Sequence, residues 1–266
     1  KSRFFDVSSA FERLFPLLLA ALIAASAVAA PSMAGAAGWE VVGNTDNVKV
    51  SRKQVEGSSK LAFRGETIAK VHIGRIVNVF ADFTQRRFWV DRWKEDRELE
   101  NRGPLERIFW IRFGLPFPVS DRDYILHVKA EPNEAARTVT ARINSVTHRK
   151  KGEDDCCVRG LVVSTYYRFE ALAGERTKLT VEVHTDPRGM LPSWVVNLIQ
   201  KKWPVKTLNG LVAAALRPTI TVRPEYQSWH EPRVVPPPPP AVPVEPVPAP
   251  VAPAAPAPAP AVVPAG

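Results

Sequence analysis

The sequence predicts an α+β domain in which an antiparallel β-sheet packs against a long C-terminal α-helix. Between residues 61 and 185, segments that mix β-branched or aromatic residues with polar ones alternate with turn formers, as in strands joined by hairpins. After Pro192, apolar residues recur at helical spacing as far as Val212. A chain of 266 residues is long enough to bury the core of such a domain.

The expected elements follow from these patterns in chain order. The strands are expected at residues 61–71, 93–100, 105–113, 123–131, 138–146, 158–170 and 177–185. A short helix is expected between the first two strands, where four apolar residues have helical spacing: Ile76, Val77, Phe80 and Phe83. The long helix is expected to bend at Pro204, and its apolar face consists of Val195, Leu198, Ile199, Leu208, Leu211 and Val212.

Residues 1–37 have the layout of a signal peptide. A basic start is followed by an apolar run from Leu17 to Ala30 and then by small residues through Ala37. This run is shorter than the roughly 20 residues that a membrane-spanning helix needs. We therefore expect an exported protein, periplasmic or secreted, with cleavage after Ala34 or Ala37. An uncleaved N-terminal anchor is the alternative.

Residues 221–266 are expected to form a disordered Pro/Ala-rich tail. More than half of the chain's 26 prolines lie from Pro232 onward, separated mainly by Ala and Val. Such a composition cannot build a core and favours extended polyproline II backbone. The tail is interpreted as a spacer suited to an exported bacterial protein, and the alternative is a binding segment for an unknown partner. The folded domain is therefore expected over residues 38–220.

The net charge of +9 belongs to the middle of the chain, because both ends carry few charged residues. A basic surface favours anionic lipid headgroups or nucleic acid. The predicted signal peptide removes the chain from the cytoplasm, so we expect no nucleic-acid partner. The densest basic clusters are residues 148–151 and Lys201–Lys202, for which solvated charge and a binding role both stay open.

The sequence contains no pattern that predicts a catalytic or metal site. The five histidines lack metal-binding spacing, and neither a nucleophile elbow nor a glycine-rich phosphate loop is present. Cys156 and Cys157 are adjacent, so disulfide geometry disfavours a bond between them; free thiols or crosslinks between two chains are expected instead. Asp121 and Asp123 are expected to cap a turn. The sequence therefore predicts no enzyme activity, no metal and no cofactor.

Residues 115–124 (LPFPVSDRDY) form the most distinctive segment, because two prolines stiffen a loop that leads into an alternating strand. The segment resembles the loop between two central strands of START domains, the StAR-related lipid-transfer family. Four other segments resemble the family in its order and spacing: residues 62–66 (AFRGE), 86–89 (RRFW), 189–197 (GMLPSWVVN) and 204–208 (PVKTL). The resemblance covers residues 38–218, and the chain is identified as an exported bacterial member.

The resemblance implies the helix-grip fold of START and Bet v 1 proteins, in which a curved sheet around the C-terminal helix encloses an apolar cavity. It also implies a function, the non-catalytic binding and transfer of a single hydrophobic lipid. A helix-grip enzyme of cyclase or hydrolase type is one alternative, with Tyr124, Thr165 and Arg86 as its polar groups. An envelope interaction module that uses the Pro-rich tail is the other alternative.

The cavity lining is expected from strand alternation together with the resemblance. Phe109, Ile111 and Phe113 share one face of their strand. The resemblance adds positions on neighbouring elements, namely Phe80, Arg86, Tyr124, Leu126, Val128, Val163, Thr165, Trp194 and Leu198. In phosphatidylcholine-binding relatives an arginine at the Arg86 position pairs with the lipid phosphate; a surface position for Arg86 is the alternative.

The loop over residues 114–120 is expected to gate the cavity. Gly114 permits unusual backbone angles, while Pro116 and Pro118 stiffen the middle. Leu115 and Phe117 would then lie at the cavity mouth and make transient contact with a membrane, opposite a lip formed by Leu191, Trp194 and Leu198. The alternative is that Leu115 and Phe117 are packed in the core.

Overall fold

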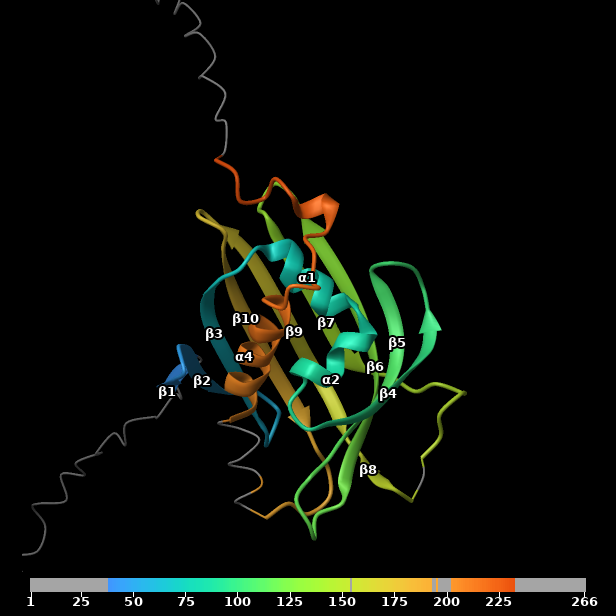
Figure 1. Cartoon of the computed structure of the whole chain (residues 1–266). Helices are drawn as coiled ribbons and strands as arrows, with labels where there is room; N and C mark the ends of the chain where they lie inside the picture. Colours follow the sequence, from blue (N-terminus) through green and yellow to red (C-terminus); the bar gives the residue numbers. More distant parts are fainter. Residues whose placement is uncertain (1–37, 154, 193–194, 196–201, 233–266) are drawn as a thin grey trace, which may run out of the picture. The chain divides into compact units, whose positions relative to one another are not determined.

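The computed structural model describes residues 38–153, 155–192, 195 and 202–232. In this part of the chain, ten strands form one curved sheet and the helices lie over one of its faces (Figure 1). The predicted α+β architecture is confirmed. The predicted signal peptide, the tail beyond residue 232, and the predicted site residues Trp194 and Leu198 lie outside the described residues.

The strands of the sheet are more numerous than the sequence predicts. They are β1 (Glu40–Thr45), β2 (Val48–Gln54), β3 (Leu61–Lys70), β4 (Trp93–Asn101), β5 (Glu106–Phe113), β6 (Asp121–Asn133), β7 (Thr138–Ser145), β8 (Cys157–Arg159), β9 (Leu161–Leu172) and β10 (Arg176–Asp186).

The strand order brings the first and last long strands together. Along the sheet the order is β1-β2-β3-β10-β9-β7-β6-β5-β4, with antiparallel pairs throughout and β8 paired in parallel with β6. Because β4 lies at the edge opposite to β1 and β2, the segment between β3 and β4 must cross the sheet. The helices α1 (Ile73–Ala81) and α2 (Arg86–Trp89) make this crossing (Figure 1).

The hairpin of β1 and β2 was not predicted. Both of its turn residues, Asp46 and Asn47, have positive φ angles, of 49° and 62°, and the flanking residues Thr45 and Val48 pair directly. Two consecutive left-handed residues define a tight hairpin turn whose twist matches that of the strands. Strand β1 is mostly exposed. Its sequence therefore does not show the alternation of apolar and polar residues by which half-buried strands are recognised.

The single strand predicted at residues 158–170 is two strands. The short β8 runs parallel to β6, and the chain then turns at Gly160 into β9. The register of β9 against β10 shifts between Val162 and Ser164. Ser164 pairs with His184, but Val162 and not Val163 pairs with Thr185. The extra residue is a β-bulge, and a bulge reverses the faces on which the following side chains lie.

The helical elements cover the side of the sheet on which the core lies. Besides α1 and α2 they are η1 (Phe83–Gln85), α4 (Trp203–Ala215) and η3 (Pro224–Tyr226). Pro204 lies in the first turn of α4, where a missing N–H costs no hydrogen bond. The described helix begins at Trp203, one residue before the proline; the predicted bend would involve residues outside the described part.

The packing of α4 on the sheet depends on Gly65 in β3. A Cβ atom added there would lie 2.8 Å from Pro204 Cβ and 3.2 Å from a methyl group of Leu208. Leu208 and Leu211 of α4 are fully buried and belong to the main core. A glycine at this point of β3 thus lets the helix approach the strand closely.

The folded domain extends beyond the predicted boundary at residue 220. Residues 216–230, here called the C-terminal strap, pack onto α1. Tyr226 and Trp229 are buried in the main core and stack edge to face at 4.7 Å. Arg75 of α1 donates to the Ala215 and Arg217 carbonyls. Residues 221–230 therefore belong to the domain rather than to the tail, because their aromatic side chains bury apolar surface.

Cys156 and Cys157 are joined by a disulfide, contrary to the expectation that adjacent cysteines would not bond. A turn at Asp155 and Cys156 precedes β8. Each cysteine is therefore already paired within the chain.

Candidate ligand-binding site

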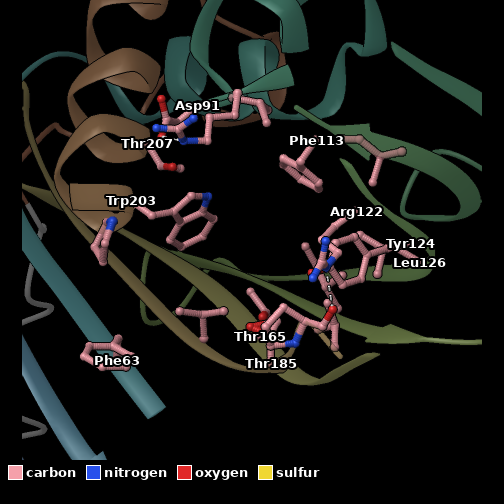
Figure 2. Close-up of a pocket in the computed structure, with 18 of the residues that line it drawn as sticks. Phe63, Asp91, Phe113, Arg122, Tyr124, Leu126, Thr165, Thr185, Trp203 and Thr207 are labelled. Atoms are coloured by element: carbon pink, nitrogen blue, oxygen red, sulfur yellow. Dashed lines mark hydrogen bonds and ion pairs between the residues drawn. The ribbon is translucent and has the colours of Figure 1, made fainter. Parts of the chain in front are cut away.

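A cavity of about 330 Å³ lies between the helix-covered face of the sheet and the helices α2 and α4 (Figure 2). Strands β5, β6, β9 and β10 form one wall, and α4 contributes Trp203, Pro204 and Thr207. In Figure 2, Trp203 and Thr207 extend from α4 toward the space that Phe113 and Tyr124 face from the other side. The volume lies at the lower end of the range typical of pockets for single small molecules.

Most of the wall consists of apolar and aromatic side chains. Phe80 lies 4.9 Å from Tyr167 and 5.7 Å from Trp89, measured between ring centroids. On the β5–β6 side, Phe113 meets Tyr124 edge to face at 5.7 Å. Such a wall attracts apolar ligand surface and offers few groups for chemistry.

The predicted residues that line the cavity come mainly from strands without bulges. Pairing of β5 with β6 runs without a shift from Glu106 to Phe113, so the predicted alternation holds along both strands. The predicted residues on the wall are Phe80, Arg86, Phe109, Ile111, Phe113, Tyr124, Leu126 and Thr165, together with the gate residue Leu115.

Two predicted lining residues lie elsewhere. Val163 is 48% exposed, because the bulge in β9 turns it away and Val162 takes the inward place. Val128 lies half-buried between the two core clusters, farther along β6 than the cavity reaches. The sequence did not predict the bulge because a bulge depends on how β9 pairs with β10, not on the residues of β9 alone.

Arg86 is buried and its charge is already balanced. Its Nη1 lies 3.0 Å from a carboxylate oxygen of Asp96 in β4, and its guanidinium lies 3.7 Å from the Phe83 ring centroid and 3.6 Å from that of Phe109. Burial lowers the pKa of the Arg86 guanidinium to about 10, while the Asp96 carboxylate opposes the decrease. A surface position for Arg86 is therefore wrong, and a phosphate would have to compete with Asp96.

Arg122 is a second buried arginine on the cavity wall, and the sequence did not single it out. It donates to the carbonyls of Ser120, Pro187 and Arg188. Burial lowers its pKa. No carboxylate pairs with it among the described residues. Arg122 thus joins the loop before β6 to the loop after β10.

These two loops lie at the same end of the sheet (Figure 1), and each carries an exposed apolar residue. Phe117 is 95% exposed and Met190 is 98% exposed, whereas Leu115 is half-buried on the cavity wall. The alternative in which Phe117 is packed in the core is therefore wrong.

Asp121 accepts from a backbone N–H of the loop before β6, as a turn cap does, whereas Asp123 binds side chains of neighbouring strands and does not cap a turn. Asp121 accepts from the backbone N–H of Leu115 and from Arg112. Asp123 is buried and accepts from Arg159 and from the indole N–H of Trp110. Both carboxylates are therefore occupied by hydrogen bonds and ion pairs within the protein.

Two polar groups on the cavity wall have no such partner in the described residues. The buried Nε1 of Trp89 and Oγ1 of Thr207 make no hydrogen bond among the described residues. Burial also raises the pKa of the Tyr124 and Tyr167 hydroxyls well above the usual range, so both stay protonated. Helical spacing could have indicated Thr207, because Trp203, Thr207 and Leu211 follow one another at intervals of four residues.

A metal-binding cluster and a membrane-spanning helix are both missing from the described residues. Within them, no group of three or more His, Cys, Asp or Glu side chains is placed to hold a metal ion. None of the described helices has the length and apolar character needed to cross a bilayer.

Comparisons with known proteins agree on one family. The family model described as START domain matches residues 34–219. An uncharacterised protein of Pseudomonas aeruginosa is 27% identical over 199 residues, which are 75% of this chain and 97% of that protein. Bovine phosphatidylcholine transfer protein is 24% identical over 190 residues, which are 69% of this chain and 86% of the relative.

Solved structures show the same fold. Human StAR-related lipid transfer protein 5 superposes with a TM-score of 0.62 at 20% identity, over 68% of this chain and 87% of that one. A STAR-related lipid transfer protein from Xanthomonas axonopodis superposes with a TM-score of 0.59 at 25% identity, over 68% of this chain and 99% of that one. The predicted helix-grip fold is confirmed.

Proposed function

Because the chain belongs to the START domain family, whose members bind and transfer lipids, we propose that it binds a single hydrophobic lipid in the cavity and transfers it between membranes without catalysis. The observation that carries this proposal is the cavity itself, enclosed by the sheet and by α2 and α4 and walled mainly by apolar side chains.

The polar groups of the wall support binding rather than turnover. Of the three polar residues that an enzyme would use, Arg86 is held by Asp96 and Tyr124 stays protonated because burial raises its pKa. A catalytic base needs an accessible group that can take up a proton near neutral pH. Among the described wall residues, the carboxylates Asp91 and Asp186 each pair with a cation.

The exposed loops provide a route by which a lipid would enter. Phe117 and Met190 lie on the two loops that Arg122 joins, and Leu115 connects the first loop to the cavity wall. Side chains of this size gain free energy when they leave water for a bilayer interface. We propose that these loops touch the membrane while a lipid passes.

We also propose, from the predicted signal peptide, that the mature protein acts outside the cytoplasm.

The test compares two tryptophan substitutions on one strand. Thr165→Trp would fill part of the cavity, whereas Val163→Trp adds the same ring two residues away on the exposed bulge. Native mass spectrometry of protein purified from its own host should detect one lipid per chain in the wild type and in Val163→Trp, and no lipid in Thr165→Trp.

Uptake of fluorescent fatty acid or sterol by the lipid-free proteins should follow the same order. A folded wild-type chain that carries no lipid and takes up no probe would refute the proposal. Equal binding by both variants would place the ligand outside this cavity.

Deletion of residues 233–266 separates the tail from lipid binding. We expect the shortened chain to bind lipid as the wild type does, because the cavity residues all lie before the tail. A loss of binding would show that the tail takes part in the site.

A further inference from the structure

Two hydrogen-bonding groups on the cavity wall lack a partner in the part of the chain that the structure describes. They are Nε1 of Trp89, whose residue is 6% exposed, and Oγ1 of Thr207, whose residue is 1% exposed. Both residues line the same cavity. Since buried polar groups in folded proteins are almost always hydrogen-bonded, two such groups on one cavity wall require explanation.

The surrounding packing holds both groups in place. Gly210 of α4 packs directly on the end of α2, where an added Cβ would lie 2.8 Å from the Trp89 carbonyl oxygen. The Trp89 indole is enclosed by Phe80 and Tyr167, at centroid distances of 5.7 and 6.2 Å. The indole therefore cannot turn its N–H toward solvent without losing its packing against Phe80 and Tyr167.

Thr207 is unusual because a buried helical threonine normally satisfies its own hydroxyl. The common partner is the backbone carbonyl four residues earlier, which here belongs to Trp203. The Thr207 hydroxyl makes no such bond. Figure 2 shows its side chain extending from α4 into the cavity, next to Trp203. The hydroxyl is thus free to bond to a molecule bound there.

The charges near these groups are balanced. Arg86 pairs with Asp96 at 3.0 Å. Asp91 lies 3.7 Å from Arg92 and is also reached by the half-exposed side chain of Lys206 at 3.5 Å. An anionic headgroup at this end would lose its hydration without gaining a free cation, and burying an unpaired charge is far more costly than burying a neutral polar group.

We propose that the part of the cavity where α2 meets α4 is a subsite for an uncharged oxygen group of the ligand, a hydroxyl or a carbonyl, bound by Trp89 and Thr207. Indole nitrogen only donates, so the ligand must supply an acceptor, and the threonine hydroxyl can donate or accept. The ligand class is a neutral lipid with a polar oxygen, in preference to a pure hydrocarbon or an ionised lipid. This inference rests on the proposed function.

The test uses three probes of equal chain length, a long-chain alcohol, the corresponding alkane and the corresponding fatty acid, each competing with a fluorescent lipid. The wild type should bind the alcohol about tenfold more tightly than the alkane, which corresponds to about 1.4 kcal/mol. Thr207→Val and Trp89→Phe should each reduce this ratio several-fold. The matched controls Thr219→Val and Trp39→Phe change the same groups away from the cavity and should leave the ratio unchanged.

A second measurement separates ligand contact from a structural role. Replacing an unpartnered buried hydroxyl by a methyl group of the same shape should not destabilise the lipid-free protein. Thr207→Val should therefore unfold at the same or a higher urea concentration than the wild type. A marked loss of stability would show that the hydroxyl has a partner within the chain and would overturn the proposal.

The remaining outcomes are also decisive. An alcohol-to-alkane ratio that neither variant changes overturns the subsite. If the fatty acid binds most tightly of the three probes and Arg122→Gln abolishes this binding, the cavity contains an anion site at Arg122 and the proposed subsite is wrong. If the folded wild type binds none of the probes and no fluorescent lipid, the proposed function fails, and the subsite fails with it.

Discussion

Near the hairpin that joins them, strands β9 and β10 pack closely against α1 and α4, whereas their other ends line the cavity together with β5 and β6. Phe169, Leu179 and Leu211 are fully buried in the first region, here called the packed half. Phe109, Ile111, Tyr124 and Leu126 form the second, here called the cavity half.

Both halves use the same apolar and aromatic residue types, so composition does not distinguish them. The difference lies in what covers them. Gly65 lets α4 approach β3 closely over the packed half. The sheet is therefore divided into a part that stabilises the fold and a part that keeps room for a ligand, and this division can be tested by matched substitutions.

The largest expected effect comes from the same substitution made in both halves. Leu211→Ala should lower the free energy of unfolding by about 3–5 kcal/mol, because it leaves a void among packed neighbours. Leu126→Ala should cost no more than about 2 kcal/mol in the lipid-free protein, because one side of Leu126 already faces the cavity. Urea denaturation of both variants measures the difference, and equal losses would contradict the division.

The sequence predicted most of the cavity-lining residues on β5 and β6, but it misplaced a residue on β9. Alternation predicts Phe109 and Ile111, and the family resemblance predicts Tyr124 and Leu126. All four line the cavity, because β5 and β6 pair without a bulge. Val163 was misplaced because a bulge depends on how β9 pairs with β10, and the residues of β9 alone do not show this pairing.

Other features escaped prediction for different reasons. The partner of Arg86 is Asp96, on the edge strand β4, and no local pattern connects the two residues. The hairpin of β1 and β2 did have a signal, since Asp46-Asn47 is a sequence suited to a turn with two positive φ angles. Tyr226 and Trp229 likewise indicated that the domain continues past residue 220, because a disordered tail rarely carries large aromatic residues.

The second prediction concerns the ion pair at the border between the halves. Asp96→Asn should destabilise the protein by about 3 kcal/mol, because it leaves the Arg86 guanidinium buried without its counter-charge. The exposed pair of Arg52 and Glu40 provides the control, and Glu40→Gln should cause no measurable loss. Equal unfolding midpoints for the wild type and Asp96→Asn would show that Arg86 does not need this partner.

The third prediction separates the loops of the cavity half from the fold. Replacing Phe117 and Met190 by Ser together should slow lipid transfer between vesicles by about tenfold, because two apolar side chains no longer enter the interface. The unfolding midpoint should not change, since both residues are almost fully exposed. Leu216→Ser, at an exposed position beyond α4, is the control and should leave the transfer rate unchanged. Unchanged transfer by the double variant would place membrane contact elsewhere.

The smallest expected effect is a pH dependence confined to the packed half, where the C-terminal strap meets α1. His72 caps α1 by accepting from the Gly74 N–H through Nδ1, and its other ring nitrogen lies 3.3 Å from the Gln227 carbonyl. The ring of His230 lies 4.3 Å away, between the Ile73 N–H and the Leu172 carbonyl. A neutral His72 satisfies both of its contacts, whereas a protonated one would point an N–H at the Gly74 N–H.

Burial lowers the pKa of His72, and the neighbouring His230 and Arg75 lower it further, while the Gln227 carbonyl and Glu175 oppose the decrease. The unfolded chain therefore binds a proton at higher pH than the folded one, and the free energy of unfolding should decrease as pH falls below about 6.5 toward the folded pKa. His72→Asn keeps a side-chain acceptor for the Gly74 N–H but cannot titrate, so its urea midpoint should vary less between pH 7.5 and 5. If the urea midpoints of the wild type and His72→Asn change with pH in the same way, protonation of His72 does not affect the stability of the protein. Lipid affinity in the cavity half should not depend on this substitution.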